Sequence, residues 1–279
     1  VTIQIKNLET ELGVRLFDRI GKQISLTHHG NLFYQYAIHL TKELAQIRDV
    51  MADAKEPKGT LALGTIESLC SSLFPPILSE YHRLFPEVSV SIVIDSPMVL
   101  LDMLNENALD IVYFLDKRLY DRKWVKVLEE PEEIVFTASA SHPFSGKKEL
   151  SLDEVIAQPF LLTERDASYR NILDRYLAAY GKKIRPFLEI GNTDFIVQML
   201  RENTGLSLLP LFSIEEDIQS GRLAALDVAD FHMQVWRQIV YHKDKWVTRE
   251  MQEFLRLAGA QSSNHEKTFH SLDFSPEQI

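Results

Sequence analysis

The sequence predicts an α/β protein in which a short amino-terminal segment and a long helix precede two consecutive α/β units. Three observations lead to this prediction. Apolar residues alternate in steps of four and three over residues 33–54, which is typical of a helix that faces a partner helix. A Lys-Glu-Pro-Lys-Gly stretch at 55–59 marks a linker. Beyond it, strand-like and helix-like segments alternate, as in a parallel sheet with right-handed crossovers.

The composition is that of an ordinary globular chain. Its 279 residues are 45% hydrophobic and 25% charged, which is enough for two domains with packed cores. No run approaches the roughly 18 apolar residues that span a membrane, and the amino terminus lacks the pattern of a secretory signal, so we expect a cytoplasmic protein. The single cysteine, Cys70, excludes an intramolecular disulfide and argues against a thiolate metal cluster.

The charge is unevenly spread along the chain. The net charge is −10, but residues 1–30 hold four basic and three acidic side chains and are therefore +1, which leaves −11 for the remainder. An acidic chain does not coat nucleic acid over its whole surface, yet the amino-terminal segment leaves room for one local contact surface.

The amino-terminal segment predicts a helix followed by a small wing. Residues 1–12 have apolar positions at near-helical spacing, and Gly13 is a residue that commonly ends a helix. Two short strands, 15–17 and 23–26, are joined by a tight turn at Gly21 with basic residues at its tip. The Thr27 hydroxyl can cap the helix that follows.

That following helix carries the apolar seam. At about 1.5 Å per residue the seam is on the order of 30 Å long. We interpret it as a surface that pairs two subunits; a looser amphipathic helix packed on its own domain is the alternative, which Leu32, Tyr36 and Val50 beside the seam leave open. The seam residues are Phe33, Ala37, Leu40, Leu44, Ile47, Met51 and Ala54.

The rest of the chain predicts two α/β units with a cleft between them, where ligands usually bind at strand carboxyl ends. The first unit has strands at 60–66, 88–95 and 110–115, a helix at 69–85 interrupted near Pro75-Pro76, and a helix at 98–105. The second has strands at 125–128, 134–138, 160–163, 187–190, 206–211 and 234–242, helices at 168–180, 193–203 and 248–258, and capped helices starting at Ser151 and Ser213. Residues 259–279 lack periodicity, which predicts a mobile tail.

The amino-terminal segment resembles the DNA-binding domain of LysR-type transcriptional regulators. Residues 8–19, LETELGVRLFDR, fit that family's LExELGxxLFxR pattern, and Leu26, Thr27 and Gly30 fit its LTxxG pattern. The family's first helix and the start of its recognition helix are absent here. The resemblance therefore implies a partial winged helix-turn-helix at residues 1–30 and a linker, or dimerisation, helix at 31–58.

Later motifs also fall in the order of that family's effector domain: GTL at 59–61, FPPIL at 74–78, FPEV at 85–88, LDI at 109–111, HPF at 142–144 and GLSLLP at 205–210. The resemblance implies the fold of type 2 periplasmic binding proteins over residues 59–258. Subdomain I would comprise about 59–133 and 232–258, and subdomain II about 134–231, with the chain crossing near Glu133 and Phe231.

The resemblance implies that the surviving part of the recognition helix contacts DNA. Short polar side chains can meet base edges in a major groove, lysines and arginines can neutralise phosphates, and a hydroxyl at a helix start can donate to one. Each residue taken alone could equally be a solvated surface group. The predicted DNA contacts are Thr2, Gln4, Lys6, Arg19, Lys22 and Thr27.

The predicted effector site is the cleft between the two units. Hydroxyls and amides at helix starts can receive a carboxylate or another small anion, and Arg170 could add a charged hydrogen bond. The serines and threonines could instead be simple helix caps, and Glu67, Glu164 and Asp194 argue against a purely anionic ligand. The predicted residues are Thr65, Ile66, Glu67, Ser68, Ser96, Thr163, Ser168, Arg170, Asn192 and Thr193.

These observations together predict a LysR-type regulator whose promoter binding is modulated by a small-molecule effector in the cleft. The expected partners are double-stranded promoter DNA, an effector for which a small organic acid is one option, and a second copy of the chain in a homodimer or homotetramer. The sequence shows no phosphate loop, nucleophile elbow or zinc helix, so we expect no enzyme, cofactor or metal. The alternatives are a cytoplasmic small-molecule-binding protein without DNA-binding activity and an α/β enzyme.

Overall fold

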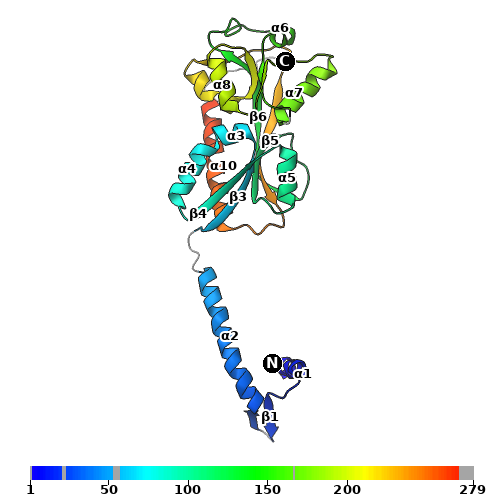
Figure 1. Cartoon of the computed structure of the whole chain (residues 1–279), viewed down its shortest axis with the longest axis vertical. Helices are drawn as coiled ribbons and strands as arrows, with labels where there is room; N and C mark the ends of the chain where they lie inside the picture. The colour runs from blue at the N-terminus through cyan, green and yellow to red at the C-terminus, as the bar shows by residue number, and fades with distance from the viewer. Residues whose placement is uncertain (1, 21–22, 53–56, 166, 270–279) are drawn as a thin grey trace. The chain divides into compact units, whose positions relative to one another are not determined.

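The computed structural model describes residues 2–20, 23–52, 57–165 and 167–269, and the chain divides into two compact units at residues 56 and 57 (Figure 1). The first unit contains α1 (Thr2–Leu12), β1 (Phe17–Ile20), β2 (Gln23–Leu26) and α2 (His28–Ala52). Strands β1 and β2 are antiparallel, with Phe17 opposite Leu26. Helix, wing and long helix therefore follow in the predicted order, although the first wing strand begins two residues later than predicted.

Residues of the amino-terminal motif hold this unit together. The Glu9 carboxylate accepts hydrogen bonds from the backbone N–H groups of Leu16 (2.7 Å) and Phe17 (3.1 Å), which ties α1 to the wing. Gly13 ends α1 with φ +67°, a conformation that glycine adopts without strain. The Thr27 hydroxyl accepts from the Gly30 N–H at 2.9 Å, as predicted for a helix cap.

Gly30 allows the first turn of α2 to approach the wing closely. A Cβ at this position would lie 2.0 Å from the carbonyl oxygen of Leu16, a backbone atom that cannot rotate away. We therefore expect Gly30→Ala to destabilise the first unit by about 1–3 kcal/mol through overpacking. Limited proteolysis of the full chain checks this, with faster cleavage within residues 1–56 expected. Gly13→Asn is the comparison variant: nothing lies within 4 Å of the added Cβ and asparagine is among the side chains that best tolerate positive φ, so only backbone strain remains and the effect should be smaller than that of Gly30→Ala. Equal cleavage rates for Gly30→Ala and the unmodified chain would contradict the prediction.

The seam of α2 is not buried by its own chain where it is described. Leu40 is 60% exposed, and Phe33 and Ala37 are only half-buried. Beside the seam, Leu32 and Tyr36 are 52% and 63% exposed. The side chains of Leu44, Ile47, Val50 and Met51, together with Ala54, lie outside the described residues. The described part of α2 therefore presents an unusually apolar surface for a solvated helix.

The second unit is built on a seven-stranded sheet with the order β10-β6-β11-β5-β3-β4, in which β9 also pairs with β6. Strands β3 (Gly59–Thr65), β4 (Val88–Ile94) and β5 (Ile111–Asp116) are parallel, as predicted. Helices α3 (Glu67–Ser72), α4 (Phe74–Leu84) and α5 (Pro97–Asn105) connect them. The predicted helix at 69–85 breaks at Leu73, and Pro75 and Pro76 lie in the first turn of α4, where no intrahelical N–H is needed.

Two long strands join the two lobes of this unit. Strand β6 (Trp124–Ser139) is continuous, whereas the sequence predicted separate strands at 125–128 and 134–138. Strand β11 (Met233–His242) pairs with β6 from Trp124 to Ile134, and this cross-strand pairing keeps the acidic stretch around Pro131 extended. Strands β9 and β10 pair with residues 134–139 of β6. We call β3–β5, α3–α5 and α10 lobe I, and α6–α9 with β7–β10 lobe II.

Lobe II contains short elements around the end of β6. The predicted capping box at Ser151 is confirmed, since the Ser151 hydroxyl and the Glu154 carboxylate each accept from the other residue's backbone N–H. The capped helix predicted to start at Ser213 is wrong, because residues 211–213 form a 3₁₀ turn, and α9 begins two residues later without a side-chain cap. The elements are α6 (Leu152–Ile156), β7 (Leu161–Leu162), α7 (Ser168–Ala179), β8 (Leu188–Glu189), α8 (Thr193–Arg201), β9 (Leu206–Pro210), α9 (Glu215–Gln219) and β10 (Leu223–Ala225), a strand that the sequence did not reveal.

Helix α10 (Arg249–Phe269) packs its apolar face on lobe I. Phe254 is fully buried, and its ring lies 6.0 Å from the ring centroids of both Phe74 and Tyr81. The helix extends eleven residues beyond the predicted end at 258, so the prediction of a tail from 259 is wrong for residues 259–269; residues 270–279 lie outside the described part. Within the described ranges, no helix is long and apolar enough to cross a membrane.

Candidate functional site

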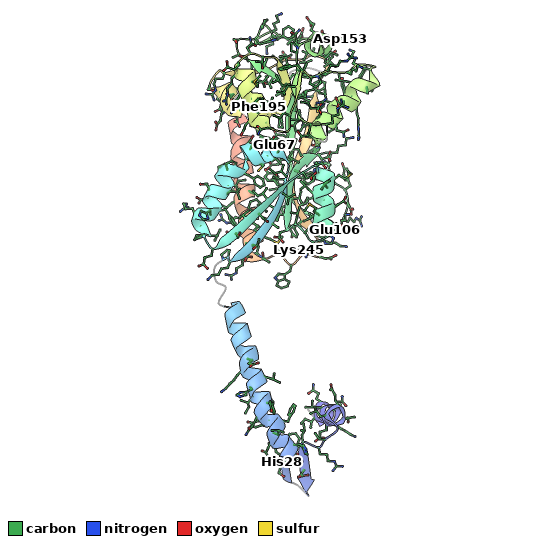
Figure 2. All side chains as sticks on the ribbon, viewed as in Figure 1. His28, Glu67, Glu106, Asp153, Phe195 and Lys245 are labelled. Carbon is green, nitrogen blue, oxygen red and sulfur yellow. The ribbon has the colours of Figure 1, made fainter. Side chains whose placement is uncertain are left out.

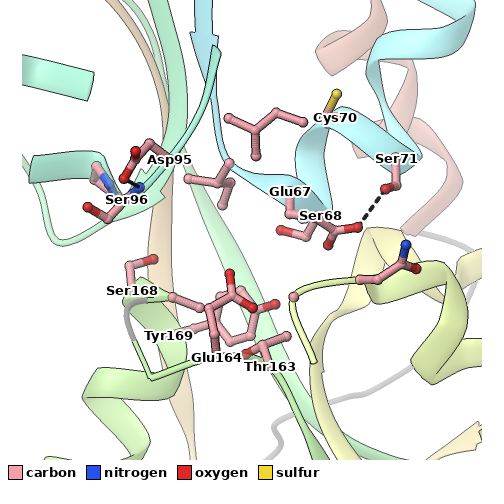
Figure 3. A pocket seen from close by; sticks show the side chains of 16 residues that line it. Glu67, Ser68, Cys70, Ser71, Asp95, Ser96, Thr163, Glu164, Ser168 and Tyr169 are labelled. Atoms are coloured by element: carbon pink, nitrogen blue, oxygen red, sulfur yellow. Dashed lines mark hydrogen bonds between the residues drawn. The ribbon is translucent and has the colours of Figure 1, made fainter. Parts of the chain in front are cut away.

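A pocket of about 590 Å³ lies between the two lobes of the second unit. Its walls come from the segments that follow β3, β4, β7 and β8, and from the starts of α3, α5, α7 and α8 (Figure 3). This volume is in the range of small-molecule sites. The lining residues are Ile66, Glu67, Ser68, Cys70, Ser71, Ile94, Asp95, Ser96, Pro97, Thr163, Glu164, Ala167, Ser168, Tyr169, Gly191 and Asn192.

Seven of the ten residues predicted for the effector site line this pocket: Ile66, Glu67, Ser68, Ser96, Thr163, Ser168 and Asn192. Strand-end reasoning found them because parallel strands bring their carboxyl ends to one edge. The same reasoning missed Cys70 and Ser71, which lie one turn further into α3, as well as Asp95, Tyr169 and Gly191. Glu164 was noted as a nearby acid but was not assigned to the site.

The remaining three predicted residues do not line the pocket. The Thr65 hydroxyl is fully buried and donates to the Tyr113 carbonyl at 2.9 Å, which fixes β3 to β5. Arg170 is buried, and its guanidinium donates to the Thr163 carbonyl (2.8 Å) and to Asp174 (3.1 Å). Arg170 therefore holds α7 to β7 and does not supply the predicted charged hydrogen bond to a ligand. Thr193 does not line the pocket but donates hydrogen bonds to Glu67, which does.

Glu67 lies at the level between the two lobes (Figure 2) and connects them across one side of the pocket. Its carboxylate oxygens each accept a 2.9 Å hydrogen bond from the backbone N–H of Thr193, the first residue of α8, and one of them also accepts from the Thr193 hydroxyl. A further bond of 2.8 Å comes from the Ser71 hydroxyl within α3. A carboxylate at a helix N-terminus is stabilised by the exposed N–H groups and the helix dipole. Glu67 therefore occupies the position on α8 that an anionic ligand would take.

Two other polar groups of the pocket have no such partner among the described residues. Oε2 of Glu164 is buried without a hydrogen-bond partner. The Ser68 hydroxyl, whose residue is 2% exposed, has none at ordinary distance but interacts with the Tyr169 hydroxyl. Glu164 lies against Gly191, where an added Cβ would be 2.7 Å from Oε2. A side chain at position 191 would therefore require the Glu164 carboxylate to move. An unsatisfied buried polar group is costly, so these atoms mark where a ligand or water would bind.

Two titratable groups of the pocket wall, Tyr169 and Cys70, favour their neutral forms. Burial raises the pKa of Tyr169, which is therefore a neutral phenol at physiological pH. Burial, and then the charge of Glu67, raise the pKa of the Cys70 thiol. Cys70 is therefore not activated as a thiolate nucleophile. Within the described part of the chain, no cluster of three or more histidine, cysteine, aspartate or glutamate residues could hold a metal ion.

The residues predicted to contact DNA lie in the first unit. Gln4 and Lys6 are exposed on α1. The Thr27 hydroxyl donates to the Arg15 carbonyl at 2.6 Å while it caps α2, so its proton is not available to a phosphate and Thr27 has a structural role. The side chains of Thr2 and Arg19, and the whole of Lys22, lie outside the described residues.

Both units match models of a single protein family. A model described as the LysR substrate binding domain matches residues 54–263, and a model described as the bacterial regulatory helix-turn-helix protein, lysR family, matches residues 1–31. The HTH-type transcriptional regulator YwqM of Bacillus subtilis is 33% identical over 263 residues, which cover 92% of this chain and 87% of YwqM. The HTH-type transcriptional activator CmpR of Synechocystis is 31% identical over 258 residues, covering 91% and 84%. Among solved structures, a full-length OxyR variant from Pseudomonas aeruginosa superimposes with a TM-score of 0.67 at 20% identity, over 92% of this chain and 88% of that one.

Proposed function

Because the chain belongs to the LysR family of transcriptional regulators, we propose that it binds promoter DNA under the control of a small molecule held between lobes I and II. The observation that carries the proposal is the pocket of about 590 Å³ whose walls come from both lobes. A ligand there contacts both lobes at once, so its binding free energy depends on how the lobes are arranged. Only such a difference in affinity between two arrangements lets a ligand shift an equilibrium.

The proposal places pairing of subunits on α2. Phe33, Ala37 and Leu40 lie on one stripe of the helix and remain half-exposed or exposed, and Leu44, Ile47 and Met51 continue the stripe in sequence. Burying such a stripe against a second copy removes apolar surface from water at about 25 cal/mol per Å². The homodimer, or a tetramer built from it, then holds two DNA-reading segments in one complex.

The proposal assigns DNA contact to the helix-turn-helix segment. Gln4 and Lys6 are exposed on α1, where a polar side chain can reach a base edge and a lysine can reach a phosphate. Arg19 and Lys22 would add phosphate contacts from the wing, and Thr2 would extend the reading surface of α1. A regulator of this kind acts in the cytoplasm, where bacterial promoters are accessible.

A titration on DNA tests the proposed function. Genomic fragments recovered by in vitro selection with the chain are labelled, and fluorescence polarisation is measured with and without a small-molecule extract of the source cells. We expect the Kd for DNA to change by roughly 5- to 150-fold, the usual range of allosteric coupling, and to rise steeply with salt because phosphate contacts release counterions. The same Kd at every concentration of extract would contradict effector control, and a Kd independent of salt would contradict phosphate binding.

A further inference from the structure

The pocket between the lobes is rich in hydrogen-bond acceptors and poor in cations. Three carboxylates line it, from Glu67, Asp95 and Glu164, while none of its described lining residues is a lysine, arginine or histidine. The two arginines nearest to these lining residues in the sequence, Arg165 and Arg170, are paired with other groups. Arg170 is bonded to Thr163 and Asp174, and the side chain of Arg165 is 76% exposed and pairs with Glu189. An anionic ligand would thus meet like charges without a compensating cation.

One receptor for an anion in this wall, the N-terminus of α8, is already filled by the chain itself. The α8 N-terminus has its first N–H and the Thr193 hydroxyl bonded to the Glu67 carboxylate. An anionic ligand at this position would have to break those bonds and leave Glu67 with only the hydrogen bond from the Ser71 hydroxyl. Taking two of its donors from a partly buried carboxylate is unfavourable, so the contact disfavours a carboxylate ligand here.

Other residues of the pocket have oxygen atoms that accept no hydrogen bond from the described residues. Oε2 of Glu164 is buried and makes no hydrogen bond to any described residue. The Ser68 hydroxyl, at 2% exposure, has no partner at ordinary hydrogen-bond distance, although it interacts with the Tyr169 hydroxyl. Gly191 leaves room for the Glu164 carboxylate in its present position. The carboxylate of Asp95 accepts one 2.7 Å bond from the Ser96 N–H, which leaves its other oxygen available. A buried carboxylate is best satisfied by a cationic hydrogen-bond donor.

We propose that the ligand of this pocket carries a protonated amine that binds Glu164, with the Ser68 hydroxyl and the Asp95 carboxylate as further polar contacts. This inference rests on the proposed function, and it replaces the small organic acid that the sequence had left open as the effector. An amine is favoured over a metal ion because the described acids and histidines do not gather into a metal site. An ammonium group satisfies the open oxygen of Glu164 without disturbing the contact between Glu67 and α8.

Three probes of the same length test this ligand class on the full chain: 1,3-diaminopropane, 1,3-propanediol and malonate. Isothermal titration at constant ionic strength measures the Kd of each. We expect diaminopropane to bind at least about tenfold more tightly than malonate or propanediol, because only the diamine offers charged donors to the carboxylates. Glu164→Gln should weaken diaminopropane binding at least about tenfold. The matched control, Glu106→Gln, changes an exposed carboxylate at the end of α5 and should leave binding unchanged (Figure 2).

Three results would overturn the proposal: tighter binding of malonate than of diaminopropane, no measurable binding of diaminopropane, or equal diaminopropane binding by Glu164→Gln and the unmodified chain. A urea unfolding curve of Glu164→Gln keeps the test independent of folding, because the neutral isostere should unfold at the same or a higher urea concentration. A failure of this proposal can be told apart from a failure of the proposed function. If the cell extract changes the Kd for DNA while diaminopropane does not bind, effector control stands and only the ligand class is wrong.

Discussion

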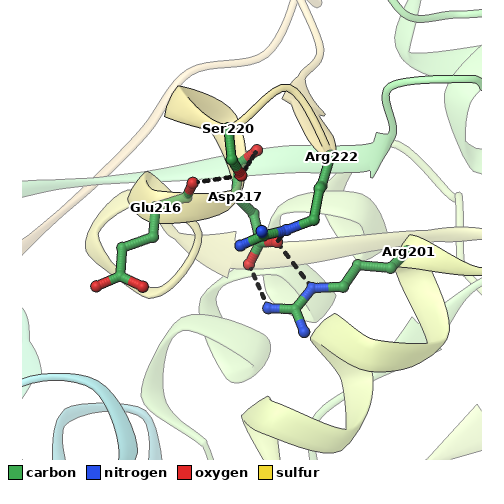
Figure 4. A network of polar contacts seen from close by, with 5 residues as sticks. All are labelled: Arg201, Glu216, Asp217, Ser220 and Arg222. Carbon is green, nitrogen blue, oxygen red and sulfur yellow. Dashed lines mark hydrogen bonds and ion pairs between the residues drawn. The ribbon is translucent and has the colours of Figure 1, made fainter.

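Replacing Asp217 with asparagine is expected to lower the free energy of unfolding of the second unit by about 2–3 kcal/mol. Asp217 is 3% exposed and accepts hydrogen bonds from Arg201 (2.7 and 2.8 Å) and from Arg222 (2.6 Å), which tie α8 and the approach to β10 to α9 (Figure 4). Asparagine keeps the shape but leaves two arginines facing a neutral amide. The expected loss is smaller than the roughly 3–5 kcal/mol typical of breaking a fully buried ion pair, because the arginine side chains are 39% and 49% exposed.

The effect of Asp217 should depend on pH in a defined direction. Burial alone would raise the pKa of Asp217, but the hydrogen bonds from Arg201 and Arg222 outweigh it and hold the pKa below the ordinary value. A depressed pKa contributes stability that is present above about pH 4 and is lost as the pH falls through the folded-state value. Urea unfolding at pH 7 and pH 3 measures this, and the difference between Asp217→Asn and the unmodified chain should shrink at pH 3.

A matched control is the exposed pair of Asp153 and Lys182. The two groups are 2.7 Å apart, but the Asp153 side chain is 70% exposed, so Asp153→Asn should cost less than about 1 kcal/mol. Equal losses for Asp217→Asn and Asp153→Asn at pH 7 would show that the network around Asp217 does not hold α8, α9 and β10 together.

Replacing Glu132 with glutamine should stabilise the second unit at pH 8 but not at pH 5. Glu132 lies on β6, and burial raises its pKa from an ordinary value near 4.5 to about 7, against the opposing charge of Arg237. Arg237 is bonded to Glu130 at 2.6 Å and lies 3.9 Å from Glu132, so it neutralises Glu132 only in part.

The sign follows from the raised pKa. The pKa of Glu132 is higher in the folded protein than in the unfolded chain. The protein therefore loses stability as the pH rises from about 4.5 to about 7, since the folded state must then hold a buried charge. Glutamine removes that charge, so the gain should reach up to about 3 kcal/mol at pH 8 and be close to zero at pH 5. Urea unfolding at the two pH values measures it, with the exposed neighbour variant Glu133→Gln as control. A gain of the same size at both pH values, or a loss at pH 8, would contradict the assignment.

Most of the element order was predictable because apolar periodicity and caps are local signals. The parallel strands β3, β4 and β5 and the Ser151 capping box follow from residues that lie close together in the sequence. The continuity of β6 was not predictable, because Pro131 and its acidic neighbours suggest a turn, and only pairing with β11, about one hundred residues later, keeps them extended.

The candidate site, too, was predictable only in part. Residues at strand ends were found, since the topology alone brings them together. The partners of individual side chains were not found: Arg170 turns to Asp174 and the Thr163 carbonyl, and Glu67 reaches Thr193, which is 126 residues away. Charge and spacing in the sequence do not reveal which acid will already be paired. The difference between a cleft for an organic acid and one for an amine depends on such tertiary contacts.

The central claim is that occupancy of the pocket between the lobes controls binding of DNA. The most direct measurement compares the effect of the cell extract on DNA affinity for Ser96→Trp and Ser91→Trp by fluorescence polarisation. Ser96 lines the pocket and its side chain makes no capping bond, so an indole there fills the cavity at little structural cost, whereas Ser91 is exposed on β4. We predict that Ser96→Trp loses the response to the extract while Ser91→Trp keeps it. An undiminished response in Ser96→Trp would contradict the claim.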